Sequence, residues 1–114
     1  MPTYSHFDLV VVPFPYTDRA TTKRRPALVL SDEANFNARV GQSVMAMVTS
    51  TQHSHWPLDV EITDLDSAGL PAPSLVRMKL FTLDHRLIIR RCGSLSEVDQ
   101  ASTQKALSRL LNWS

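Results

Sequence analysis

A cluster of three cations, Lys23, Arg24 and Arg25, leads directly into Pro26 and an apolar run. Proline disfavours helical geometry in the residue before it, so Arg25 is predicted to lie at the entrance of an extended strand. A guanidinium is permanently charged, and its planar fork of N–H donors matches the oxygens of a phosphate. The alternative is a solvated flank that protects a strand edge, and the stretch taken alone favours that alternative.

A second polar stretch follows the apolar run that ends at Val48. Its hydroxyls, amide, imidazole and indole belong to Thr49, Ser50, Gln52, His53 and Trp56. Hydroxyls and amides can bind phosphate oxygens, histidine can move protons near neutral pH, and tryptophan can stack on a base. The alternative is a polar turn whose hydroxyls bond to nearby backbone, and the stretch alone favours that turn slightly.

Two pairs of cations lie farther along the chain. Arg77 and Lys79 alternate with apolar residues, so they are predicted to share one face of a strand, as a track of phosphate contacts or as a solvated face. Arg90 and Arg91 are neighbours and must point to opposite faces. We expect one of them to pair with an acid such as Glu61 and the other to be exposed.

Other kinds of site have little support. His53 and His55 form a His-x-His pair, but no third ligand with suitable spacing is near, and neither a metal nor a cofactor is expected. The carboxylates are scattered, so a two-metal nuclease or a glycosidase is not indicated. The three glycines are isolated, which excludes a glycine-rich phosphate loop, and no Gly-x-Ser-x-Gly motif is present.

The elements that must position these residues are short apolar runs separated by turn residues, a pattern typical of β structure. Strands are expected over residues 7–14, 27–31, 44–49, 58–62 and 87–92, and from residue 74 onward, where Val76, Met78 and Leu80 would share a face. One helix is expected after Ser96, with Asp99 in the capping-box position. Its predicted apolar stripe consists of Val98, Ala101, Leu107, Leu110 and Leu111. The fold class is therefore mainly β (α+β), a small barrel closed by a C-terminal α-helix.

Length and composition set limits on the class of protein. The chain has 114 residues and a net charge of +1, so one domain over residues 1–114 is expected, and overall charge gives no indication of a nucleic-acid partner. Cys92 is the only cysteine and is predicted to be a buried, inert thiol. We see no basic leader and no span near the roughly 20 apolar residues of a membrane helix, so we expect a cytoplasmic protein with no membrane contact.

Taken in order, the motifs resemble the MazF/PemK toxins of bacterial toxin–antitoxin systems. They are FDLVVVPFPYTD, KRRPALVLS, VTSTQ followed by WPLDVEI, AGLPAPSLVRMKLFTLD and RCGSLSEVDQ. The resemblance covers nearly the whole chain, and the arginine-proline segment together with the VTSTQ segment is fairly specific. It implies an SH3-like β barrel, a homodimer and a metal-independent endoribonuclease that cuts single-stranded RNA. It also implies a cognate antitoxin, which we expect to bind through an acidic, partly disordered tail.

The resemblance assigns the catalytic arginine and threonine to Arg25 and Thr49. His53 is our own candidate for the general base, because it closely follows Thr49 and its ordinary pKa is suitable. The residues expected to contact RNA are Lys23, Arg24, Ser50, Gln52, Trp56, Arg77 and Lys79. Two alternatives stay open, a toxin of the same barrel fold that binds DNA gyrase and an inactive RNA-binding barrel.

Three departures from the family pattern matter. Phe7 stands where many members have a glycine before the acidic residue. The first loop, from Tyr16 to Arg24, lacks the Gly-x-Glu-Gln of the best-known members. Some members place an aspartate two residues after an arginine on a later strand, where this chain has Lys79 after Arg77. A mechanism that needs this aspartate is therefore not expected here.

Overall fold

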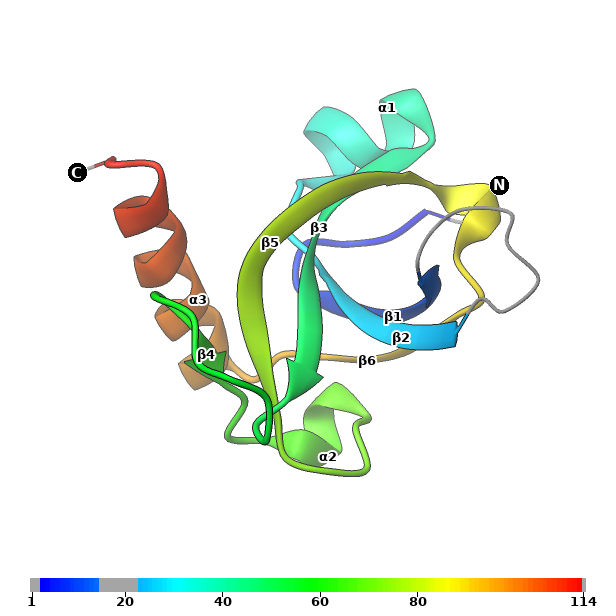
Figure 1. The fold of residues 1–114 in the computed structure, drawn as a ribbon. Helices are drawn as coiled ribbons and strands as arrows, with labels where there is room; N and C mark the ends of the chain where they lie inside the picture. The colour runs from blue at the N-terminus through cyan, green and yellow to red at the C-terminus, as the bar shows by residue number, and fades with distance from the viewer. Residues whose placement is uncertain (1–2, 15–22, 114) are drawn as a thin grey trace.

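A computed structural model describes residues 3–14 and 23–113, and its six strands form one antiparallel sheet in the order β4-β5-β3-β2-β1-β6. The strands are β1 (Asp8–Phe14), β2 (Lys23–Val29), β3 (Gln42–Ser50), β4 (Val60–Glu61), β5 (Ser74–Asp84) and β6 (Arg90–Ser94). The sheet curls into a half barrel with the C-terminal helix α3 (Glu97–Leu110) at one side (Figure 1). This confirms the predicted fold class. Residues 15–22, most of the first loop, lie outside the described part.

Short helical segments connect the strands. They are the π-helical turn η1 (Glu33–Asn37), α1 (Ala38–Val40), α2 (Leu65–Ala68) and the 3-10 turn η2 (His85–Leu87). In Figure 1, α1 and α2 lie at opposite ends of the half barrel. No helix among the described residues is long and apolar enough to cross a membrane.

The central strands are apolar on both faces, because each face packs against its own cluster. Leu9 pairs with Leu28, and Val10 pairs with Ala27, so each pair shares a face. Leu9 and Leu28 belong to the cluster covered by α2 and α3, through residues such as Ala68 and Ala106. Val10 and Ala27 belong to the second cluster, whose members include Val12, Val29, Met45, Met47, Phe81 and Leu83. These continuous apolar runs are what the short-strand pattern predicted.

A bulge interrupts β5. Ala46 pairs with Leu80, but its neighbour Met47 pairs with Arg77, which leaves Met78 and Lys79 as extra residues. Val76 still pairs with Val48 and Leu80 with Ala46, and Met78 packs against the same cluster as Val76. The expected common face of Val76, Met78 and Leu80 is therefore confirmed, although Leu80 is 38% exposed. Arg77 and Lys79 likewise line one pocket, as their predicted common face implies, but Arg77 is buried and Lys79 is exposed.

The last strand begins later than expected. Residues 85–87 form η2, which the Asp84 side chain caps by accepting a hydrogen bond from the Arg86 N–H, and β6 starts at Arg90. The expected strand over 87–92 is thus wrong at its start. Arg90 and Arg91 do divide their roles, since Arg90 is exposed and Arg91 Nε lies 3.0 Å from Asp8 Oδ1. The acid is Asp8 on the neighbouring strand β1, and not Glu61.

Helix α3 begins as predicted, with Ser96 Oγ accepting a hydrogen bond from the Asp99 N–H at 3.3 Å. The predicted buried stripe is wrong, because Val98 is 67% exposed and Leu111 44% exposed. The helix buries Asp99, Thr103 and Ala106 instead. The cause is the Asp99 carboxylate, which accepts hydrogen bonds from the backbone N–H groups of Thr63 and Asp64 and from the Thr63 hydroxyl, at 2.8–3.1 Å. A polar anchor therefore decides which face of α3 is buried.

Candidate catalytic site and nucleic-acid interface

The ends of β2 and β3 bring Arg25 and Thr49 together. Ala27 pairs with Met47, and Arg25 and Thr49 continue that register two residues farther along. Strand side chains alternate between faces, so Arg25 and Thr49 are on the same side as this pair. Both are half-buried and line a pocket of about 170 Å³. The other lining residues are Phe14, Met47, Val48, His53, Trp56, Arg77 and Lys79.

His53 completes a contact with Thr49 from the turn that follows β3. Its Nδ1 lies 3.2 Å from Thr49 Oγ1. The turn is held by two hydrogen bonds to Ser50, from the His53 N–H to the carbonyl oxygen at 3.2 Å and from the Gln52 N–H to Oγ at 3.1 Å. The imidazole is exposed, so its other ring nitrogen, Nε2, can meet a ligand in the pocket. This arrangement can support proton transfer beside the Thr49 hydroxyl.

Arg77 reaches the pocket from β5, but most of its donors are already used. Its Nε lies 3.2 Å from Asp59 Oδ1, and its Nη2 lies 3.0 Å from Asp59 Oδ2 and also donates to the Ser54 carbonyl oxygen. The guanidinium carbon lies 5.0 Å from the centroid of the Trp56 ring. Arg77 is only 8% exposed and Trp56 is 42% exposed. Arg77 thus supports the Trp56 ring from one side and leaves much of the indole open to a ligand.

Asp59 is a site residue that the sequence reasoning missed. It also accepts a hydrogen bond from the Trp56 N–H at 2.9 Å, so it ties the loop after β3 to Arg77. Burial alone raises the pKa of Asp59, but the hydrogen bonds and the charge of Arg77, with the Trp56 N–H, outweigh it and hold the pKa below its usual range. The sequence did contain a pointer to this role. Residues 58–62 alternate between apolar and acidic side chains, so Asp59 was predicted to lie on the polar face, where it could pair with a cation.

The other residues predicted to contact RNA lie at different distances along the chain from the residues that line the pocket, and only Lys79 is among its lining residues. Lys79 is exposed at its rim, with Nζ 5.7 Å from the centroid of the Phe14 ring. Ser50 is half-buried and Gln52 is exposed in the turn that carries His53. Lys23 and Arg24 are exposed at the start of β2. Arg24 lines a different pocket, of about 260 Å³. Arg25 lines both this pocket and the pocket of Thr49.

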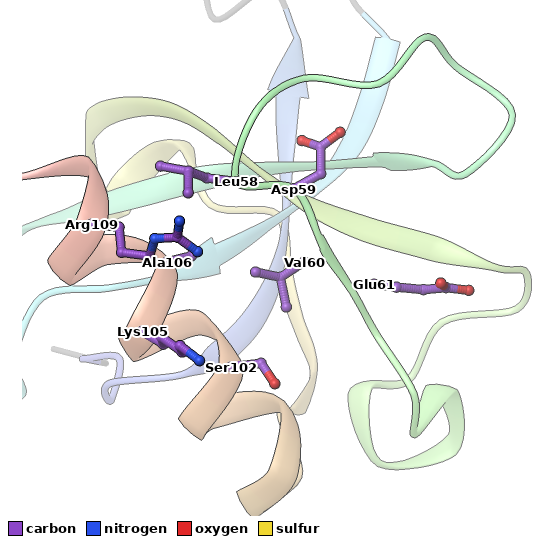
Figure 2. A pocket seen from close by; sticks show the side chains of 8 residues that line it. All are labelled: Leu58, Asp59, Val60, Glu61, Ser102, Lys105, Ala106 and Arg109. Carbon is purple, nitrogen blue, oxygen red and sulfur yellow. The ribbon is translucent and has the colours of Figure 1, made fainter.

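A larger cavity, of about 350 Å³, lies between α3 and the segment around β4 in the described part of the chain. Figure 2 shows Ser102, Lys105 and Arg109 along the α3 side of this cavity, and the Asp59 carboxylate turned away from the helix. None of the predicted catalytic residues lines it. Within residues 3–14 and 23–113, no group of three or more His, Cys, Asp or Glu side chains is placed to hold a metal ion.

Solved structures similar to this chain are toxins and toxin–antitoxin complexes. An endoribonuclease in complex with its cognate antitoxin from a mycobacterial species has a TM-score of 0.77 and 17% identity, covering 100% of this chain and 98% of the other. Mycobacterium tuberculosis toxin MazF-mt6 has a TM-score of 0.75 and 18% identity, covering 94% and 98%. MazE–MazF from Deinococcus radiodurans has a TM-score of 0.74 and 26% identity, covering 97% and 98%.

Among curated proteins, no sequence matches this chain. A family model described as "PemK-like, MazF-like toxin of type II toxin-antitoxin system" matches residues 5–111. This match covers nearly the entire chain, and the curled sheet with its terminal helix agrees with the fold of the similar toxin structures. The chain therefore belongs to the PemK-like, MazF-like toxin family of type II toxin–antitoxin systems.

Proposed function

We propose that this toxin is a metal-independent, sequence-specific endoribonuclease that cuts single-stranded RNA. The observation that carries the proposal is one pocket that holds Arg25 and Thr49, with His53 within 3.2 Å of the threonine hydroxyl. These groups supply a fixed positive charge, a hydroxyl and a proton acceptor, which together suit phosphodiester chemistry without another cofactor. Family membership and the similar endoribonuclease structure support the same reaction class.

The reaction is attack of a ribose 2′-hydroxyl on the adjacent phosphorus. A new bond forms between the 2′-oxygen and phosphorus, and the bond to the 5′-oxygen of the next nucleotide breaks. The 2′-hydroxyl loses its proton to a base, and the leaving oxygen gains one. The products carry a 2′,3′-cyclic phosphate and a 5′-hydroxyl. DNA lacks the attacking hydroxyl and is not a substrate.

Each residue of the pocket has a distinct role in this reaction. Arg25 stabilises the charge that develops on the phosphate, a contribution for which loss of one preorganised donor typically costs a factor of about 10²–10³. Thr49 positions a phosphate oxygen or the 2′-hydroxyl. In the neutral tautomer whose Nδ1–H donates to Thr49 Oγ1, Nε2 of His53 is unprotonated and can accept the proton of the 2′-hydroxyl.

The surrounding residues bind the substrate. Trp56 offers an open ring face for one base, and Arg77 holds that ring in place. Because its guanidinium is buried against Asp59 and Ser54, we assign Arg77 this positioning role and no longer a contact with phosphate. The contacts to backbone phosphates come from Lys23, Arg24, Ser50, Gln52 and Lys79, which makes RNA binding sensitive to salt.

The proposal includes the toxin's partners. We propose that the chain acts as a cytoplasmic homodimer whose cognate antitoxin blocks the RNA site with an acidic, partly disordered tail. The complexes of related toxins with antitoxins support this assignment. The cations around the pocket supply the complementary charge.

The test compares purified protein on single-stranded RNA and on DNA of the same sequence. The proposal expects RNA fragments and intact DNA. Growth arrest with RNA left intact would contradict the proposal and favour a toxin that binds gyrase. RNA binding without cleavage would also contradict it and favour an inactive RNA-binding barrel.

A further inference from the structure

A second pocket, of about 260 Å³, lies on the other face of the sheet from Ala27 and Met47. Val11 pairs with Pro26 on one side and with Arg90 on the other, so these three residues share a face. Arg24 is two residues before Pro26 on β2, so it lies on the same face and lines the same pocket. Arg25 lines this pocket as well as the pocket of Thr49 and His53, so the two pockets meet at the proposed catalytic arginine.

The far wall of this second pocket is built by close backbone packing. Gly69 follows α2 with a φ of +72°, and a Cβ at this position would lie 1.9 Å from the Cys92 carbonyl oxygen. A Cβ on Gly93 would lie 2.4 Å from the Ser67 carbonyl oxygen. Only glycines allow β6 and the turn after α2 to approach this closely. The contact places Leu70 and Pro71 opposite Arg90 as a fixed apolar wall.

Among the residues that the structure describes, the charged side chains that line this pocket are all positive. Its charged lining residues are Arg24, Arg25 and Arg90, and none of these has an ion pair with any residue that the structure describes. Arg91, by contrast, is paired with Asp8. Burial raises the pKa of the Cys92 thiol, so this residue adds no negative charge to the pocket near neutral pH. The free guanidiniums are therefore available for an anionic ligand.

A third, largely apolar pocket of about 200 Å³ connects the two sites. It is lined by Arg25, Thr49 and Ser50 on one side and by Leu70 and Pro71 on the other. An extended polyanion at Thr49 can therefore continue past Arg25 along this surface toward Arg90. A single strand of RNA fits this path, because it presents regularly spaced phosphates together with sugars and bases that can contact an apolar wall.

We propose that Arg90 and Arg24 form a phosphate subsite for single-stranded RNA, separate from the scissile phosphate at Arg25. The inference rests on the proposed function and extends it, since Arg90 was not among the predicted RNA contacts. Arg90 binds a backbone phosphate on one side of the cut and does not touch the reacting atoms. It should therefore affect binding of long RNA and leave the chemical step unchanged.

The test uses Arg90→Gln with Arg39→Gln as a control, because Arg39 is also an exposed arginine and lies on α1, outside all three pockets. The probe is a fluorescent 2′-O-methyl RNA, which cannot be cut by the proposed reaction. Arg90→Gln should raise its Kd roughly three- to tenfold, as expected for one charge-assisted contact at a partly exposed site. A plot of log Kd against log salt concentration should become less steep, its slope falling by about 0.7 for the loss of one phosphate contact. Arg39→Gln should change neither, and an unchanged Kd and slope for Arg90→Gln would overturn the subsite.

Two further measurements distinguish an RNA subsite at Arg90 from a catalytic role and from a protein interface. With cleavable RNA, Arg90→Gln should raise KM and leave kcat unchanged, whereas an equal fall in kcat would place Arg90 in the chemical step and contradict the proposal. If the wild type binds the 2′-O-methyl RNA through Arg90 but cuts no RNA, the proposed function fails and the subsite survives. A variant that loses binding to an acidic peptide but retains RNA binding, or that changes the oligomeric mass in light scattering, would overturn the subsite in favour of a protein interface.

Discussion

Arg77 and Asp59 form a two-point ion pair, with Nε–Oδ1 and Nη2–Oδ2 distances of 3.2 and 3.0 Å, directly behind the Trp56 ring. Their side chains are only 10% and 9% exposed. The pair joins β5 to the loop that carries both His53 and Trp56. It therefore links the stability of the fold to the geometry of the proposed RNA site.

Removing one partner of this pair should destabilise the protein strongly. We expect Asp59→Ala to lower the free energy of unfolding by roughly 3–5 kcal/mol, because Arg77 would remain as an uncompensated buried charge. The control is Arg86→Ala, which breaks the exposed pair with Asp84 but leaves the Asp84 cap of η2 in place, and its loss of stability should be much smaller. Urea denaturation measures both, and equal losses in the two variants would refute the structural role of Asp59.

Trp56 should contribute to RNA affinity through stacking. Trp56→Ala should weaken binding of 2′-O-methyl RNA by about 1–3 kcal/mol, the range for one base on an aromatic ring. Trp56→Phe should restore part of this loss, because phenylalanine retains a π-face. Fluorescence anisotropy with labelled RNA provides the comparison. Full affinity in Trp56→Ala would show that no base stacks there.

His53 should act in the chemical step. His53→Ala should lower kcat by a factor of about 10²–10⁴, the usual contribution of a positioned acid or base. His55→Ala is the matched control, since His55 is an equally exposed histidine two residues away that does not line the pocket. Single-turnover cleavage measures both variants. Comparable rates for His53→Ala and the wild type would remove His53 from the mechanism.

Lowering the pH should weaken the hydrogen bonds by which Asp99 holds α3 against Thr63 and Asp64. Burial alone raises the pKa of Asp99, but hydrogen bonds from Thr63, Asp64 and Ser96 outweigh it and lower the pKa below that of an ordinary aspartate. The folded state therefore binds this proton more weakly than the unfolded state. The contribution of Asp99 is complete above the ordinary aspartate pKa of about 3.9 and is lost as pH falls through the folded-state pKa.

The corresponding measurement is the free energy of unfolding as a function of pH. Asp99→Asn should be less stable than the wild type at neutral pH, and the difference should shrink as the solution becomes acidic. Thr63→Val removes one of the donors to Asp99 and should reduce the acid dependence in part. A difference between Asp99→Asn and the wild type that stays constant with pH would contradict this account.

The sequence predicted the parts of the site that depend on order along the chain. The polar run after Val48 indicated the end of a strand, and antiparallel pairing of β2 with β3 then places Arg25 beside Thr49. The predicted strand entrance at Arg25 was wrong, because β2 already begins at Lys23 and Arg25 pairs with Val12. The strand alternation correctly grouped Arg77 with Lys79, which line one pocket, but it did not reveal the bulge in β5 that leaves Arg77 buried and Lys79 exposed. A bulge depends on pairing with β3, and no local pattern reveals it.

Long-range polar contacts account for the remaining errors. The buried face of α3 was predicted from its apolar residues, but the hydrogen bonds of Asp99 to Thr63 and Asp64 select a different face. One of Arg90 and Arg91 was expected to pair with an acid such as Glu61, yet the partner of Arg91 is Asp8, which becomes a neighbour only when β6 pairs with β1. In both cases, a residue distant in sequence determines the orientation.

The most direct test of the proposed reaction is analysis of RNA ends after cleavage in excess EDTA. Purified wild type and Arg25→Ala would be incubated with the same RNA, and the fragments identified by mass spectrometry. We predict that the wild type cuts in EDTA, leaving 2′,3′-cyclic phosphate and 5′-hydroxyl ends, and that Arg25→Ala is slower by about 10²–10³. Cleavage that disappears in EDTA, fragments with 3′-hydroxyl ends, or full activity of Arg25→Ala would contradict the proposed mechanism.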